Sequence, residues 1–144
     1  MRTLGIDYGT ARVGLALSDE MGVIATPHSV LSYSRAVAAE IAAIVARENV
    51  GAVVVGMPYD LRGRETESTR RVKNFVVTLG DALTAAGVSC PIHERDEALS
   101  SQRAVARMVE AGVRKEKRRQ KENTDMWAAA IILQEHLDEI ASHR

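Results

Sequence analysis

Residues 4–19 read Leu4-Gly5-Ile6-Asp7-Tyr8-Gly9-Thr10-Ala11-Arg12-Val13-Gly14-Leu15-Ala16-Leu17-Ser18-Asp19. Two runs of alternating side chains flank a turn that contains glycine, which predicts two strands of a hairpin. In the first run Leu4 and Ile6 face one way, and Gly5 and Asp7 face the other. One face of the first strand is therefore apolar, and the other ends in a carboxylate.

Asp7 stands at the end of the first predicted strand, with Gly9 two residues further on. A carboxylate held beside bare backbone suits a metal ion or a phosphate group. Asp and Gly are also ordinary turn residues, so Asp7 could simply begin the turn. The local pattern leaves both interpretations open.

Length and composition predict one domain over residues 1–144, in a globular protein of the cytoplasm. Hydrophobic residues make up 46% of the chain and charged residues 26%, which is ordinary for a globular domain. Cys90 is the single cysteine, so an internal disulfide is excluded and a reducing compartment fits. No apolar run approaches the length of a membrane span, and no signal peptide is evident, so we expect no membrane association.

The charges balance overall, with 19 basic and 19 acidic residues, but they are unevenly distributed. Six of the eight residues from Arg114 to Lys121 are basic. Such a segment can neutralise phosphates, although most charge runs are solvated loops. Aromatic residues make up only 3% of the chain, which argues against recognition by a broad stacking platform.

Patterning along the chain predicts the element order β-β-β-α-β-α-β-α-α. Pro27 and Pro91 each favour an edge position for the strand that contains them. A three-strand antiparallel meander followed by αβαβ predicts an α/β protein with a mixed five-stranded sheet and helices on its faces. After the hairpin, the expected strands span 23–31, 52–56 and 88–93, and the expected helices span 32 or 34 to 49, 68–86, 100 or 101 to 111, and 125–142.

Three places put a carboxylate at the end of an element: Asp7, the pair Asp96 and Glu97, and Asp125. If the first, fourth and fifth strands run parallel, their carboxyl ends share one edge of the sheet, where ligands gather. Oxygen ligands there suit hard divalent cations, which assist phosphodiester hydrolysis. Alternatively, Asp96 and Glu97 are solvated loop residues and Asp125 complements a helix dipole.

Four stretches together resemble the bacterial pre-16S rRNA nuclease family, the small relatives of the RuvC Holliday junction resolvases that are also called YqgF or RuvX. The stretches cover nearly the whole chain in the family's order: 5–16 with Gly5-Ile6-Asp7-Tyr8-Gly9, 55–75 with Val55-Gly56-Met57-Pro58, 96–101 with Asp96-Glu97-Ala98-Leu99-Ser100-Ser101, and 125–137 with Ala128-Ala129-Ala130-Ile131-Ile132-Leu133.

This resemblance implies an RNase H-like fold and a nuclease that hydrolyses phosphodiester bonds in RNA, with maturation of the 16S rRNA precursor as its role. It implies that Asp7, Glu97 and Asp125 are both catalytic and metal-binding, with Mg²⁺ or Mn²⁺ as cofactor. In that reading Gly9 and Gly14 keep the backbone low so that a nucleic-acid strand can approach. We expect the nucleic-acid backbone to contact basic side chains at Arg12, Arg62, Arg64, Arg71, Arg114, Lys115, Lys117, Arg118, Arg119 and Lys121.

Two departures from the family pattern bear on function. Ala98 stands where the family usually has arginine, and Arg95 is the candidate to supply that contact. The similar junction resolvases carry a fourth acid at the position of Ala128, which weakens the case for cleavage of DNA junctions. Alternatives therefore stay open: a Holliday-junction-type nuclease acting on structured DNA, or a non-catalytic RNA-binding or transcription-associated factor. Related nucleases pair, so a homodimer is also an expectation.

Overall fold

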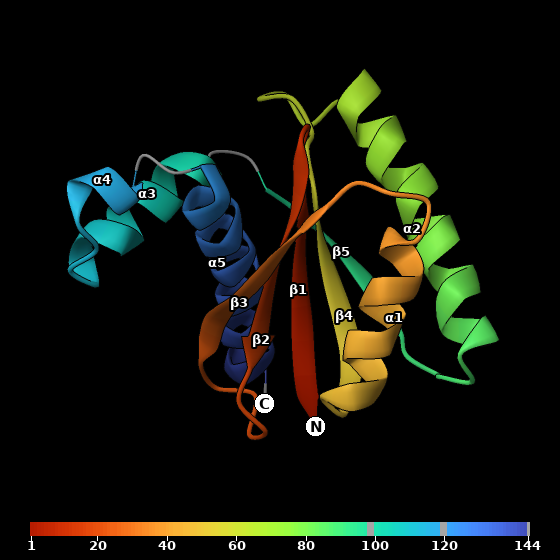
Figure 1. Ribbon diagram of the computed structural model, residues 1–144. Helices are drawn as coiled ribbons and strands as arrows, with labels where there is room; N and C mark the ends of the chain where they lie inside the picture. The colour runs from red at the N-terminus through yellow and green to blue at the C-terminus, as the bar shows by residue number, and fades with distance from the viewer. Residues whose placement is uncertain (98–99, 119–120, 144) are drawn as a thin grey trace.

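A mixed five-stranded sheet forms the centre of the protein, in the strand order β3-β2-β1-β4-β5 (Figure 1). The first three strands form an antiparallel meander, and β1, β4 and β5 run parallel to one another. This computed structural model describes residues 1–97, 100–118 and 121–143, with the backbone alone at 100–102, 118 and 121–123. The strands are β1 (Arg2–Tyr8), β2 (Arg12–Ser18), β3 (Ala25–Ser32), β4 (Val50–Met57) and β5 (Ile92–Asp96).

Helices cover both faces of the sheet, as the sequence predicts. Helices α1 and α2 lie on one face and α5 lies on the other, with α3 and α4 beyond α5 (Figure 1). The helices are α1 (Val37–Arg47), α2 (Glu67–Ala85), α3 (Ser100–Glu110), α4 (Lys115–Arg118) and α5 (Lys121–Ser142). In the described part of the chain, no helix is both long enough and apolar enough to span a bilayer.

The alternation within β1 separates two hydrophobic layers. Leu4 and Ile6 are fully buried in the larger core, with α1 and α2. On the opposite face, a Cβ atom at Gly5 would lie 2.7 Å from Leu133 Cβ of α5. The unbroken apolar run of β4 divides in the same way, since Val55 joins the larger core and Val54 joins the layer under α5. The predicted assignment of faces is thus confirmed.

Both proline-containing segments lie at sheet edges, as expected, because β3 and β5 are the outer strands. The predicted start of the fifth strand is wrong, however. Val88 N–H donates to the carbonyl of Leu83 and so closes the end of α2, where Gly87 has φ 73°. The strand begins at Ile92 and reaches Asp96, three residues beyond the predicted end.

Two helix starts also differ from prediction. Ser34 does not cap a helix at that point: its Oγ accepts a hydrogen bond from Ala36 N–H, and α1 begins only at Val37. Helix α5 begins at Lys121 and not at Asp125, which places Asp125 after the first turn. A short helix, α4, occupies part of the segment that was expected to be a basic loop.

Candidate active site

Asp7 lies near the end of the central strand β1 and is buried. A glycine lies beside it on each neighbouring strand. Gly14 of β2 is its Cα partner, and Gly56 of β4 follows Val55, the partner of Ile6. Glycine has no side chain, so the face of the sheet on either side of Asp7 is open to side chains from elsewhere.

Glu97 fills the opening at Gly56. It follows β5 directly, and its N–H donates to the carbonyl of Met57 at 3.1 Å. A Cβ atom at Gly56 would lie 2.7 Å from Glu97 Oε2 and 2.5 Å from Ile132 Cδ1 of α5. The Glu97 carboxyl group therefore lies over β4, on the face of the sheet that α5 covers.

Asp125 fills the opening at Gly14. A Cβ atom at Gly14 would lie 2.2 Å from the Asp125 carbonyl oxygen and 3.1 Å from its Cβ atom. Gly14 thus admits the backbone of α5, and the expectation that it leaves room for a nucleic-acid strand is wrong. Asp125 is buried, and its Oδ2 lies 3.9 Å from Nη1 of Arg12.

Glu97 is protonated in this arrangement. Burial raises its pKa, the Asp7 carboxylate raises it further, and the Glu97 carboxyl group donates a hydrogen bond to Asp7, so that the pKa reaches about 10. The positive charge of Arg71 acts in the opposite direction. Glu97 Oε2 is buried without a hydrogen-bond partner among the described residues.

This donor set fits a hard divalent cation. It consists of carboxylate oxygens alone, and the buried Oε2 atom of Glu97 lacks the partner that such an ion would provide. The side chains do not yet converge on a single ion position. Among residues 1–97, 100–118 and 121–143, no group of three His, Cys, Asp or Glu side chains is close enough to hold one ion. Asp7 and Glu97 are in contact, whereas Asp125 Oδ2 lies near Arg12.

Arg71 is engaged in holding the hairpin turn that follows Asp7. Its Nη2 donates to the carbonyl of Gly9 at 2.8 Å, and its Nη1 donates to the Tyr33 hydroxyl at 3.2 Å. The guanidinium group also lies over the Tyr8 ring, 4.7 Å from the centroid. The expected nucleic-acid contact of Arg71 stays a prediction, and the structure adds a positioning role.

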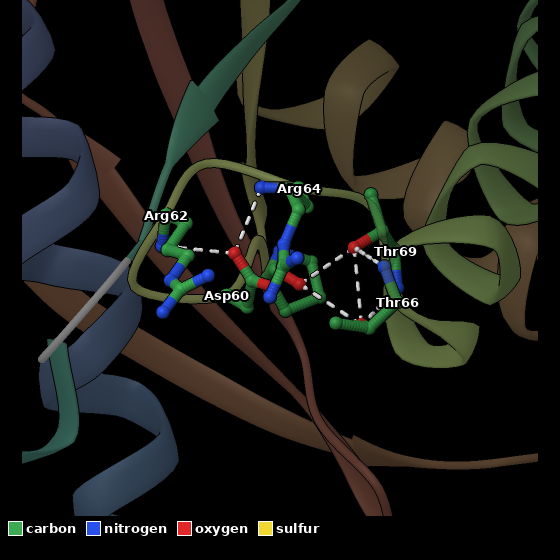
Figure 2. A network of polar contacts seen from close by, with 6 residues as sticks. Asp60, Arg62, Arg64, Thr66 and Thr69 are labelled. Atoms are coloured by element: carbon green, nitrogen blue, oxygen red, sulfur yellow. Dashed lines mark hydrogen bonds and ion pairs between the residues drawn. The ribbon is translucent and has the colours of Figure 1, made fainter.

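The loop between β4 and α2 carries Arg62 and Arg64 and is held by Asp60 (Figure 2). Asp60 Oδ1 accepts from the backbone N–H groups of both arginines, at 2.9 and 2.8 Å, and Oδ2 accepts from Arg64 Nε at 3.0 Å. These bonds hold the pKa of Asp60 below its usual range. The Arg62 side chain is exposed and makes no polar contact with the described residues.

The opposite end of this loop is fixed to α2. Thr66 and Thr69 form a reciprocal capping box, and both hydroxyl groups donate to the carbonyl of Pro58 (Figure 2). Hydrogen bonds therefore fix the conformation of the loop at both ends, and none of them uses the Arg62 side chain.

The described part of the basic segment, residues 114–118, lies on the far side of α5 from helices α1 and α2 (Figure 1). Arg114, Lys115 and Lys117 are exposed there. The side chains of Arg118 and Lys121, and all of Arg119, lie outside the described residues, as does Ala98. Arg95, the candidate substitute for an arginine at position 98, instead forms ion pairs with Glu135 and Glu139 of α5.

Sequence reasoning missed three contributors to the site. The positions of Gly14 and Gly56 on the strands that flank Asp7 depend on strand register, which the sequence does not state. The ion pair of Arg12 with Asp125 joins residues that are far apart in the chain. Asp60 carried a usable signal, because Asp at the start of a loop that contains Gly63 (φ 76°) is a typical turn residue.

Comparison with known proteins identifies relatives of this chain. A relative from Maridesulfovibrio salexigens, named "Putative pre-16S rRNA nuclease", is 42% identical over 136 residues, which cover 93% of this chain and 96% of the relative. A relative of the same name from Chloroflexus aggregans is 40% identical over 138 residues, covering 94% of this chain and 92% of its own.

Solved structures of junction resolvases share the fold. RuvC of T. thermophilus in complex with a Holliday junction substrate superposes with a TM-score of 0.59 at 21% identity, covering 98% of this chain and 96% of RuvC. The Fowlpox virus resolvase in complex with Holliday junction DNA gives a TM-score of 0.60 at 10% identity, covering 97% and 99%. The fold is thus RNase H-like, as expected. The sequence model of the family described as "RuvX: Holliday junction resolvase" matches residues 1–139, and this chain belongs to that family.

Proposed function

We propose that this protein is a metal-dependent nuclease that hydrolyses phosphodiester bonds in RNA, and that its substrate is the 16S rRNA precursor. One observation carries the proposal: Asp7, Glu97 and Asp125 lie on one face of the sheet, over three adjacent strands, at the end where β1 and β4 finish. The names of the relatives from Maridesulfovibrio and Chloroflexus support RNA as the substrate.

Asp7, Glu97 and Asp125 would hold Mg²⁺ or Mn²⁺. A bound divalent cation would polarise the scissile phosphate and stabilise the charge that develops as water attacks. Binding would require Glu97 to lose the proton that it donates to Asp7, and Asp125 to exchange Arg12 for the ion. In the free protein this proton leaves the pair of carboxyl groups with one negative charge instead of two.

Arg12 and the loop between β4 and α2 would hold the substrate. Arg12 Nη1 lies 3.9 Å from Asp125 Oδ2 in the free protein. If Asp125 holds the cation, the guanidinium group of Arg12 can contact a phosphate instead. Arg62 projects from a loop that Asp60 fixes independently. This arrangement supports a phosphate contact by Arg62 that costs the loop no rearrangement.

A second candidate function, cleavage of four-way DNA junctions, is supported by the description of the family model and by the shared fold of the resolvases. Against it stands Ala128, at the position of the fourth acid in those enzymes. A third, non-catalytic RNA binding, needs only the basic residues.

The test is cleavage of a 16S precursor RNA, single-stranded RNA and a four-way DNA junction in Mn²⁺, Mg²⁺ or chelator. We expect RNA cleavage that chelator abolishes and that Asp7→Asn lowers by about 100-fold or more. Asp81→Asn, which removes an exposed acid of α2 away from the site, is the matched control and should cleave normally. Cation-dependent cleavage that survives Asp7→Asn would refute the site, and cleavage of the junction alone would refute the RNA substrate. RNA binding in chelator without any cleavage would favour the non-catalytic function.

Three further expectations, on domain organisation, location in the cell and oligomeric state, accompany this proposal. The chain would act as one domain in the cytoplasm, where ribosomal RNA precursors are processed, and it would form a homodimer. Light scattering of the purified protein measures the oligomeric state directly, and a monomer at working concentration would contradict the dimer.

A further inference from the structure

We infer that the hollow between the end of β1, the β3–α1 connection and α2 binds a backbone phosphate of the substrate strand, away from the catalytic carboxylates. The inference rests on the proposed function. The hollow has a volume of about 340 Å³, within the range of small-ligand sites. Tyr8 and Phe75 form its apolar part, and Ser34, Arg35, Arg71 and Asn74 supply polar groups.

The charge of this hollow points to an anion. Arg35 and Arg71 line it, and no carboxylate does. Three other described cavities differ in this respect: the one between α3 and α5 includes Glu110 and Glu135, the one under β3 includes Asp19, and the one between β5 and α5 includes Glu94 and Glu139. Two guanidinium groups in a hollow whose lining contains no carboxylate are suited to recognise a phosphate.

The hollow also contains unused hydrogen-bond donors. Arg71 spends Nη1 on the Tyr33 hydroxyl and Nη2 on backbone carbonyls, which leaves its Nε–H without an acceptor among the described residues. Ser34 Oγ accepts from Ala36 N–H, so its own hydroxyl proton can be donated. Arg35 is exposed and forms no ion pair in the described part of the chain.

The position of the hollow suits a strand that also reaches the carboxylates. Tyr8 follows Asp7 directly, and successive side chains of a strand point to opposite faces. The hollow therefore lies behind the same strand end, on the side of α1 and α2. Arg71 connects the hollow with the strand end that carries Asp7. It lines the hollow, and it also donates to the carbonyl of Gly9, two residues after Asp7. A nucleic-acid strand that crosses this end of the sheet can contact both.

The test compares Arg35→Glu with Arg70→Glu by fluorescence anisotropy of a labelled single-stranded RNA, in chelator so that no cleavage occurs. Arg70 is exposed on α2 but does not line the hollow, so it controls for the change in net charge. We expect Arg35→Glu to weaken binding about tenfold and to lower the slope of log K against log salt by about 0.7. Arg70→Glu should change affinity less than about twofold.

Equal losses in both variants, or no loss in either, would overturn the inference. A second arm follows the backbone amide NMR signals of residues 34–38 during titration with the RNA and with inorganic phosphate alone. Shifts with RNA would support binding of the RNA strand in the hollow. Shifts with inorganic phosphate, together with unchanged RNA affinity in Arg35→Glu, would assign it to a free phosphate and refute substrate binding. Because these measurements need no cleavage, they stand even if the nuclease assay fails.

Discussion

At the scale of single residues, Glu97 determines how the metal-free site responds to pH. Its pKa is about 10 in the folded protein against an ordinary value of 4.5. Between these values the folded chain keeps a proton that the unfolded chain releases, so folding stability falls as pH rises through this window. Glu97→Gln removes this titration and retains a hydrogen-bond donor to Asp7. We expect the variant to be more stable than wild type at pH 8 by about 1–3 kcal/mol.

Denaturant titrations in chelator at pH 5, 7 and 9 measure this difference. The stability gap should be small at pH 5 and grow toward pH 9, while the variant cleaves no RNA. A stability difference that does not change with pH would contradict the proton on Glu97.

The sequence alone predicts an acid near Asp7 but does not choose between Asp96 and Glu97 without the family resemblance. The choice depends on which of two adjacent residues turns inward after β5.

At the scale of elements, the docking of α5 on β2 depends on Gly14. A Cβ atom there would lie 2.2 Å from the Asp125 carbonyl oxygen, so Gly14→Ala must displace the backbone of α5. We expect a loss of about 1–3 kcal/mol in unfolding free energy from the steric clash. Cleavage should fall about 100-fold, because Asp125 moves with the helix.

Gly80→Ala in α2 is the matched control for that change. A Cβ atom at Gly80 has no neighbour within 4 Å, and alanine favours helix, so this variant should gain about 1 kcal/mol. Wild-type cleavage by Gly14→Ala would show that the contact tolerates an added methyl group and that Asp125 is not positioned by it.

Strands that are defined by burial could be predicted from the sequence, whereas the ends of helices and strands could not. Alternation along residues 4–17 and the apolar run of residues 52–56 both follow from burial. The sequence therefore predicts these three strands, and for the first of them it also predicts the face of each side chain. Element ends depend on local hydrogen bonds that composition does not reveal. Val88 N–H closes α2 instead of joining β5, and α1 starts at Val37 without a capping side chain.

At the scale of the whole molecule, the sheet separates a larger core from a thinner layer, and the thinner layer adjoins the three carboxylates of the proposed site. The larger core, with α1 and α2, holds Leu4, Ile6 and Val55. The layer under α5 includes small side chains such as Ala16 and Ala129, and Gly14 lets that helix come close enough to the sheet to bring Asp125 beside β2. The sequence predicts these layers, but not the closeness of α5, which results from contacts between distant segments.

Substrate attraction in a chain of zero net charge must come from local groups, and the basic segment beyond α5 is the densest of them. Arg114 and Lys115 are exposed there, outside the carboxylate site. The double change Arg114→Gln with Lys115→Gln should therefore raise KM several-fold and leave kcat unchanged, since these side chains act on binding and not on the reacting phosphate. The slope of log K against log salt should fall by about 0.7 for each charge removed.

Cleavage assays across a salt series measure these effects. Arg70→Gln on α2 is the control for the loss of charge. A fall in kcat at saturating RNA would instead indicate that the segment helps to position the scissile phosphate.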